Sequence, residues 1–188
     1  MTDNDIYNAV HSIIAIVTGL GNDHIIPADD NRPAPASSYA SIKVGADRSQ
    51  RGQANIVKSN TGLVSSPIGD VKDVNHDIKS QVVVDVSINF YRSNAIENAS
   101  DLFQANKWPT ISDLLFQAGI GWKGAGPVND LTVLQSQEQE ERSQITITLL
   151  YEQTKSVITN AIYEVQVVVE NENGDTIQSE TSNVPTGV

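Results

Sequence analysis

The chain has 188 residues, a formal net charge of −11 and no cysteine. This length is sufficient for one domain with a substantial core, and we expect residues 1–188 to form a single domain. The lack of cysteine excludes disulfide bonds and thiolate metal sites. The acidic balance argues against a protein that grips nucleic acid, since phosphate binding depends on clustered lysine and arginine.

The sequence also argues against membrane insertion. It contains no run of about 18 apolar residues, so we expect no membrane-spanning helix. The acidic start, Met1–Asp5, lacks the basic residues of a signal peptide.

The first predicted element is a helix that Asp3 or Asn4 caps and that Gly19 and Gly21 end. Its apolar residues recur at helical spacing: Ile6, Val10, Ile13, Ile14 and Val17. A proline-containing loop over residues 21–38 follows, and then a short strand over residues 40–44.

A long polar segment over residues 45–79 shows little periodicity and contains several glycines, so we expect a loop or arm there. Loops of this length inside a compact domain are uncommon and are usually functional or disordered. The segment contains five lysine and arginine residues, so it could contact an acidic surface. Its lysines and arginines are Arg48, Arg51, Lys58, Lys72 and Lys79.

The strand predicted over residues 82–90 has apolar side chains at every second position, which indicates one buried face and one wet face. Two helices follow it. Ser93 or Asn94 caps the first, which runs to about Ala105, and Pro109 begins the second, which Gly119 ends. The predicted core residues are Ile96, Ala99, Leu102 and Phe103 in the first helix, and Ile111, Leu114, Leu115 and Ala118 in the second.

Residues 119–126 match the pattern G-x-G-x-x-G, but a helix precedes the glycines and a predicted strand, 128–134, follows them. The dinucleotide-binding signature needs the reverse order, so we expect a turn that exposes Trp122. Trp122 and Trp108 are candidate subunit contacts, because large aromatic side chains anchor interfaces. Ordinary packing is the alternative for both.

The C-terminal third is predicted to consist of strands. A polar connector over residues 135–141 leads into a strand over 142–151, which continues as a strand or bent segment through Val157. A strand over 163–169 follows, and Asn173–Gly174 indicates a hairpin turn. The return strand covers residues 176–180, and we expect a free tail over 181–188.

This third of the chain is acidic, and Arg142 and Lys155 are its only lysine or arginine residues from Gln135 onward. The acidic surface is either simply solvated or complementary in charge to a neighbouring subunit. Arg142 either pairs locally with Glu140 or Glu141, or makes a two-pronged contact with a carboxylate across the sheet or on a neighbouring subunit.

No residue pattern indicates catalysis, a cofactor or a metal. The three histidines, His11, His24 and His76, have no nucleophile paired with them in the sequence, and the carboxylates show no catalytic spacing. Asp29 and Asp30 are interpreted as loop surface. The group at Asp70, Asp73, His76 and Asp77 lacks the ligand geometry of a metal site. We therefore expect no enzyme activity, no catalytic residue, no cofactor and no metal.

Several short motifs together resemble the neck or tail terminator proteins of tailed bacteriophages. In chain order they are Asn31–Pro35, Tyr39–Ile42, Val86–Tyr91, Ala118–Ile120, and Glu141–Ser143 leading into Ile145–Tyr151. The resemblance covers nearly the whole chain. The family pattern leads us to expect a glycine after the strand that ends at Tyr91, where this chain has Arg92.

The resemblance implies an α+β fold with a mixed, mostly antiparallel sheet flanked by helices. It also implies a virion protein that assembles in the host cytoplasm into a ring, normally a hexamer, at the head-proximal end of the tail. Its partners would be further copies of itself, the tail tube protein, head–tail connector or neck proteins, and a sheath protein if the tail contracts. DNA would be only a transient cargo in the lumen.

The candidate subunit-interface residues are Arg48, Arg51, Lys58, Trp108, Trp122 and Arg142. The alternative function is a stand-alone β-rich module that binds protein or carbohydrate. Mass in solution separates the two, because a ring predicts several subunits and a lone module predicts one.

Overall fold

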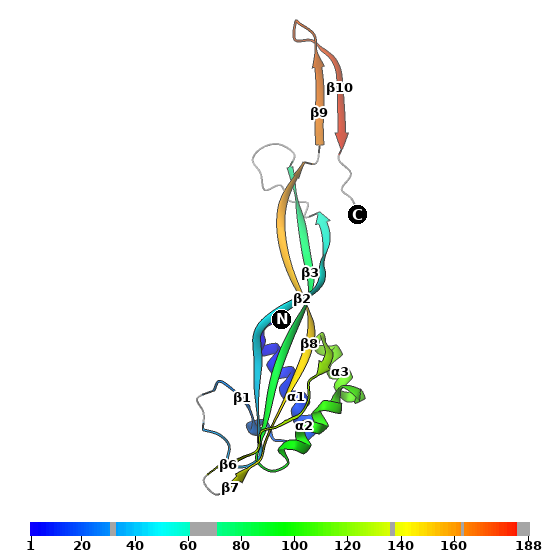
Figure 1. Ribbon diagram of the computed structural model, residues 1–188. Helices are drawn as coiled ribbons and strands as arrows, with labels where there is room; N and C mark the ends of the chain where they lie inside the picture. The colour runs from blue at the N-terminus through cyan, green and yellow to red at the C-terminus, as the bar shows by residue number, and fades with distance from the viewer. Residues whose placement is uncertain (31–32, 61–70, 136–137, 163, 184–188) are drawn as a thin grey trace. The chain divides into compact units, whose positions relative to one another are not determined.

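The computed structural model describes residues 1–30, 33–60, 71–135, 138–162 and 164–183. These residues form an α+β fold, so the predicted fold class is confirmed (Figure 1). They divide into two compact units. The first contains Met1–Gly52 and Gln81–Gln153, and the second contains Gln53–Ser80 and Thr154–Val188. That all of these residues behave as one domain stays a prediction.

The main sheet has six strands, and it is mixed and mostly antiparallel, as predicted. Its order is β1 (Ile25–Pro27), β2 (Tyr39–Asn60), β3 (Val71–Tyr91), β8 (Arg142–Ile162) and β4 (Ile120–Ala125), and β5 (Asn129–Asp130) also pairs with β8. β1 lies parallel to β2, whereas β4 and β5 lie antiparallel to β8. Two small antiparallel sheets join β6 (Val133–Gln135) to β7 (Glu138–Glu140) and β9 (Glu164–Glu170) to β10 (Thr176–Asn183).

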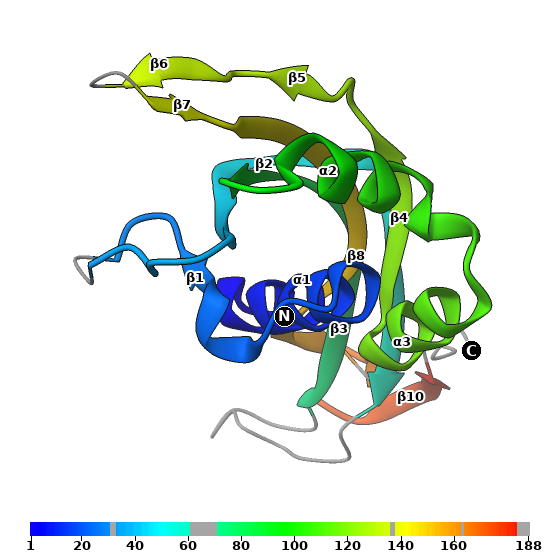
Figure 2. The ribbon, with the colours of Figure 1, turned by 90° about the horizontal axis from the view of Figure 1, so that it is seen from below.

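The helices are α1 (Asp3–Thr18), α2 (Ala95–Gln104) and α3 (Pro109–Ala118), with short 3₁₀ turns η1 (Asn22–His24) and η2 (Ala105–Lys107). In the first unit, α1 lies within the curve of the sheet, with α2 and α3 beside it (Figure 2). Gly19 and Gly119 end α1 and α3 in the left-handed conformation, with φ of 70° and 66°, as their sequence positions predicted.

The core lies between these helices and one face of the first-unit sheet. The predicted alternation is confirmed, because β3 buries Val82, Val84, Val86, Ile88 and Phe90, and β8 buries Ile145, Ile147, Leu149 and Tyr151. The α1 residues Ile6, Val10, Ile13 and Ile14 and the α3 residues Ile111 and Leu115 complete it from the helix side. The first-unit sheet is therefore covered by helices on one face and polar on the other.

The predicted core face of α2 is partly wrong. Ile96 and Phe103 are exposed, and the buried residues are Ala95, Ala99 and Leu102. These three share a face at the spacing i, i+4, i+7, whereas Ile96 and Phe103 follow one residue later, about 100° around the helix. Asn94 stands at the N-cap with a left-handed φ of 65°, so Ala95 begins the helix against the sheet.

Strands replace much of what the sequence indicated as loop. The loop expected over residues 45–79 is wrong for residues 45–60 and 71–79, which belong to β2 and β3, whereas residues 61–70 lie outside the described part. Pairing between the strands maintains the strand structure of these polar segments. Because neither segment has a continuous buried face, apolar and polar residues do not alternate regularly along it. Whether the segment acts as an arm stays a prediction.

The remaining differences between the sequence prediction and the structure concern shorter elements. The glycine turn at 119–126 contains β4, the strand expected over 128–134 is divided between β5 and β6, and β7 lies in the expected connector. The three-residue strand β1 lies in the expected proline loop. Of the expected free tail, Thr181–Asn183 belongs to β10, and residues 184–188 lie outside the described residues.

The N-terminal cap of α1 leads to a prediction about how the stability of the protein depends on pH. Thr2, rather than Asp3 or Asn4, caps the helix in a capping box with Asp5. The Thr2 backbone N–H donates to the Asp5 carboxylate at 2.7 Å, and the Thr2 hydroxyl donates to it at 2.9 Å. Both hydrogen bonds lower the pKa of Asp5, and the backbone bond has the larger effect. Because this pKa is lower in the folded state, the stabilisation is present above the unfolded pKa of the carboxyl. It is lost as the pH falls through the folded pKa.

We expect Thr2→Ala to raise the pKa of Asp5 part of the way towards its ordinary value, because only the hydroxyl bond is removed. Thr2→Ser keeps the hydroxyl and is expected to leave this pKa nearly unchanged. Titration of the Asp5 carboxyl by NMR checks both variants. Equal pKa values in the alanine and serine variants would contradict the role of the hydroxyl.

Candidate interaction surfaces

Within the described residues, no group of three or more histidine, aspartate or glutamate side chains is placed to hold a metal ion. The sequence indicated no nucleophile beside a histidine, but the structure places Ser37 Oγ 3.0 Å from His24 Nδ1. The same nitrogen lies 3.1 Å from the carbonyl oxygen of Ser38. A carbonyl only accepts hydrogen bonds, so Nδ1 carries the proton in that contact and is not available as a base for Ser37.

The outer face of the first-unit sheet carries a row of polar bonds between β3 and β8. Thr148 donates to Asp85 at 2.6 Å, and Gln144 donates to Ser87 at 2.9 Å. Arg142 Nη2 makes a longer contact of 3.4 Å with Asn89 Oδ1. These pairs link the central strands on the face opposite the core, so much of this polar face is bonded within the subunit.

Two tyrosines and two arginines stack at the end of this row. The rings of Tyr39 and Tyr91 are parallel, with centroids 4.5 Å apart. The Arg92 guanidinium lies 5.7 Å from the Tyr39 ring, and that of Arg142 lies 5.0 Å from the Tyr91 ring, within the range of cation–π attraction. The pKa of Tyr39 is raised, mainly because the side chain is partly buried and, as the second cause, because Tyr91 lies beside it.

Arg92 follows the strand in the left-handed conformation, with φ of 68°. This conformation explains why the family pattern suggests a glycine there. Its side chain donates to the carbonyls of Pro35 and Ser37 and lies 3.8 Å from the Glu140 carboxylate. These contacts hold a non-glycine residue in an unfavourable backbone conformation.

A pocket of about 350 Å³ lies beside the stack. Lys43, Tyr39, Tyr91, Asn89 and Arg142 line it together with Asp29, Asp30 and residues of β1. Arg142 Nε is buried there without a hydrogen-bond acceptor, and leaving a charged donor unbonded is costly.

This geometry bears on the alternatives for Arg142. Of the two expected local partners, Glu140 lies beside Arg92, and the partner of Arg142 across the sheet is the amide of Asn89 rather than a carboxylate. Within the described residues, no ion pair of Arg142 is formed. Asp29 and Asp30 of the same chain also line this pocket, and a contact between Arg142 and a carboxylate of a neighbouring subunit stays a prediction.

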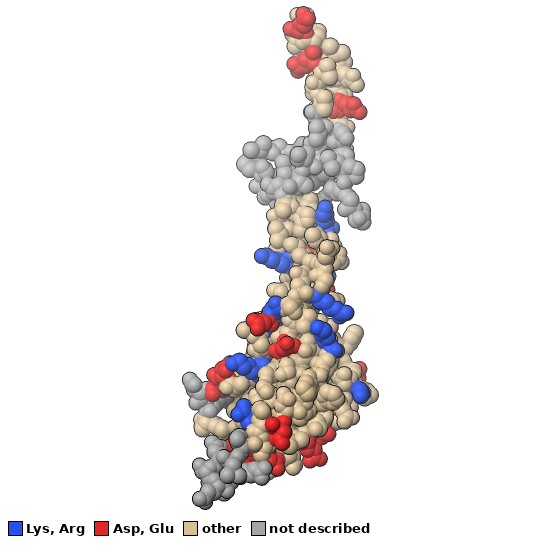
Figure 3. Space-filling view, in the orientation of Figure 1, with Lys and Arg blue, Asp and Glu red and all other residues tan. Residues whose placement is uncertain are grey.

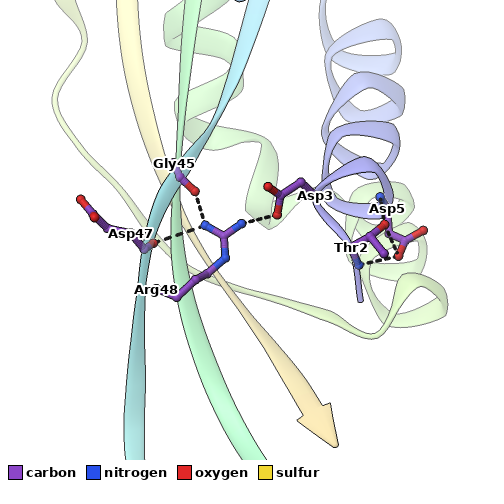
Figure 4. A network of polar contacts seen from close by, with 6 residues as sticks. All are labelled: Thr2, Asp3, Asp5, Gly45, Asp47 and Arg48. Atoms are coloured by element: carbon purple, nitrogen blue, oxygen red, sulfur yellow. Dashed lines mark hydrogen bonds and ion pairs between the residues drawn. The ribbon is translucent and has the colours of Figure 1, made fainter.

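The three basic candidates differ in their surroundings. Arg48 donates to the Asp3 carboxylate and to the carbonyls of Gly45 and Asp47 in its own chain (Figure 4). Arg51 and Lys58 are exposed on β2. That these three residues contact a neighbouring subunit stays a prediction, with Arg48 already engaged within its own subunit.

The two tryptophans also differ. The expected exposure of Trp122 is wrong: β4 pairs with β8, which turns Trp122 to the same side as the buried Ile120, where it packs against the core. Trp108 is exposed at the start of α3.

Exposed apolar side chains on α2 and α3 are further candidates for subunit contacts. Besides Trp108, they are Ile96, Phe103 and Phe116, and 86% of Phe116 is exposed. Sequence reasoning did not select Ile96, Phe103 or Phe116 as candidate contacts. Phe116 lies off the stripe formed by Ile111 and Leu115, and that spacing was the available signal.

Comparison with known proteins gives one family. The family described as phage neck terminator protein matches residues 4–179. No curated protein matches the chain. Within the described residues, no helix is long and apolar enough to cross a membrane. The match spans most of the sequence and agrees with the motifs and the α+β fold, and the chain therefore belongs to the phage neck terminator family.

Proposed function

We propose that this neck protein forms a ring, normally of six subunits, at the head-proximal end of the tail. The ring ends growth of the tail tube and joins the tube to the head connector. The family match over residues 4–179 carries this proposal. The protein acts by assembly in the virion and catalyses no reaction.

Two properties of the chain support assembly. Several large apolar side chains of α2 and α3 are exposed, and subunit interfaces commonly cover such side chains. Charge is also uneven along the sequence, with a basic segment in β2 and acidic residues towards the C-terminus. A cyclic ring needs two different, complementary patches on each subunit, and this unevenness suits that requirement.

The proposed partners are the tail tube protein, connector or neck proteins and, in a contractile tail, the sheath protein. DNA passes through the lumen and is not held, which suits a chain of net charge −11. Repulsion between acidic side chains and phosphates acts over roughly 8 Å at physiological salt, so it limits adhesion at the lumen wall. Assembly in the host cytoplasm precedes incorporation into the virion.

Measurement of the mass in solution tests this proposal against the stand-alone binding module. Light scattering behind size-exclusion chromatography is expected to give about six times the 20.3 kDa of one chain, and electron microscopy is expected to show rings. A single-chain mass at every concentration tested would favour the binding module.

Arg142 gives a test at residue level. We expect Arg142→Lys to weaken ring assembly nearly as much as Arg142→Ala, because lysine keeps the charge but loses the planar fork and the stacking on Tyr91. Sedimentation at a series of concentrations measures the loss. If the lysine variant assembles like the unchanged protein, Arg142 is only a counter-charge and leaves the set of interface candidates.

A further inference from the structure

In the part of the chain that the structure describes, the outer edge of β2 pairs with another strand over only a short stretch. β1 pairs with β2 only at Ala40–Ile42, although β2 continues to Asn60. Within the described residues, no other strand lies on that side. In the second unit this edge strand carries Ile56, Val57 and Lys58, all exposed, and 54% of Ile56 is exposed. Unpaired edge strands are templates for pairing with another chain.

The β9–β10 hairpin is a second incompletely paired element. Its strands pair with each other from Glu164–Asn183 to Glu170–Thr176, and within the described residues they pair with no third strand. Both sides of β9 are apolar and exposed, with Val167 and Val169 on one side and Val168 on the other. A two-stranded hairpin is marginally stable alone in water and needs a further strand or a packed face.

Charge distinguishes between the possible partners of the hairpin. Residues 164–183 contain five acidic residues and no lysine or arginine. The acidic side chains Glu170, Glu172, Asp175 and Glu180 are exposed, and Figure 3 shows acidic side chains on the surface of this hairpin. Residues 43–60 of β2 contain four basic residues and one acidic residue. The other edge of the sheet, formed by residues 152–162 of β8, contains one basic and one acidic residue. The β2 edge is therefore the complementary one.

We infer that the β9–β10 hairpin of one copy adds to the β2 edge of the next copy. Main-chain hydrogen bonds would extend the sheet, as in β-strand addition. The exposed valines of β9 would cover Ile56 and Val57, and the acidic hairpin would face Lys58. Because the two surfaces differ, the contact is head-to-tail and closes into a ring when the rotation permits. The inference rests on the proposed ring and names its subunit contact.

Thiol cross-linking tests the contact directly, since the chain has no cysteine. Ile56→Cys and Val168→Cys proteins are mixed, allowed to assemble and treated with a short bifunctional maleimide. We expect a cross-linked dimer in the mixture and little in either variant alone. Ile158→Cys mixed with Val168→Cys probes the β8 edge, and Ile16→Cys mixed with Val168→Cys is an exposed control. Both are expected to stay uncross-linked.

The outcomes separate this contact from the ring itself. A ring-sized mass without the 56–168 cross-link would overturn the inference and leave the proposed ring intact. A 158–168 cross-link in its place would assign the hairpin to β8. A cross-link found only within the chain of the Ile56→Cys/Val168→Cys double variant would show that the hairpin folds back on its own subunit, and would also overturn the inference.

Charge reversal provides an independent readout. Glu170→Lys with Glu180→Lys is expected to weaken assembly by about tenfold or more at low salt, and adding Lys58→Glu to the same chain is expected to restore part of the loss. Asp23→Lys with Asp130→Lys makes the same change of charge at exposed positions outside the hairpin, α2 and α3, and serves as the control. Circular dichroism confirms that each variant is folded. Equal losses in the hairpin variant and this control, or no recovery with Lys58→Glu, would overturn the inference.

Discussion

Replacing Ile88 with alanine is expected to lower the free energy of unfolding by about 2–5 kcal/mol. Ile88 is 0% exposed and lies on β3, between β2 and β8 in the sheet. The cost combines the lost burial of the side chain with the cavity that remains in a packed core. Urea denaturation followed by circular dichroism measures it.

Ile16→Ala is the matched control, because it makes the same chemical change at an exposed position of α1. We expect it to change stability by about 0.5 kcal/mol or less. A cost below roughly 1 kcal/mol for Ile88→Ala, or equal costs at the two positions, would show that the buried face of β3 is wrongly assigned.

The second large effect is expected at Gly45, where β2 and β3 approach closely. A Cβ at this position would lie 2.6 Å from the carbonyl oxygen of Asp85, a backbone atom that cannot rotate away. Gly45→Ala must therefore push the strands apart, and we expect it to cost about 1–3 kcal/mol, as overpacked substitutions do. The same denaturation experiment measures it.

Gly124→Ala is the control for this prediction, because a Cβ at Gly124 meets nothing within 4 Å. It is expected to be nearly neutral. If the two glycines tolerate alanine equally well, the close approach of β2 and β3 at Gly45 is not a constraint on the fold.

The sequence correctly predicted the elements in which one buried face alone determines the hydrophobic pattern. β3 and the first half of β8 alternate because one face meets the helices and the other meets polar surroundings. The α3 stripe and the two C-terminal glycines of α1 and α3 follow equally local rules. The Asn173–Gly174 turn between β9 and β10 is confirmed for the same reason, since a turn is a property of adjacent residues.

The elements that sequence reasoning missed depend on distant residues. β2 beyond Val44 and the start of β3 are mostly polar and lack a regular alternation, so their strand structure comes from pairing with each other and leaves little periodic signal. β4 contains two glycines and forms because β8 lies beside it. The face of α2 was misassigned because large side chains suggested the core, whereas small alanines allow the helix to approach the sheet.

The candidate site was predictable in part. The motifs identified the family, and Trp108 and Arg142 were selected from residue type and position. The structure adds what the sequence could not give: the Tyr39–Tyr91 stack, the pocket beside it and the unbonded Nε of Arg142. These features join residues about 50 positions apart in the chain, such as Asn89 and Arg142, and no local pattern connects them.

The most direct test of the central claim, that this neck protein ends the tail and joins it to the head, is electron microscopy of a phage whose gene for this chain is interrupted. The proposed role predicts filled heads and separate tails, with tail tubes that exceed their normal length, and rescue when the intact protein is supplied. Complete, infectious particles of normal tail length in the absence of the protein would contradict it.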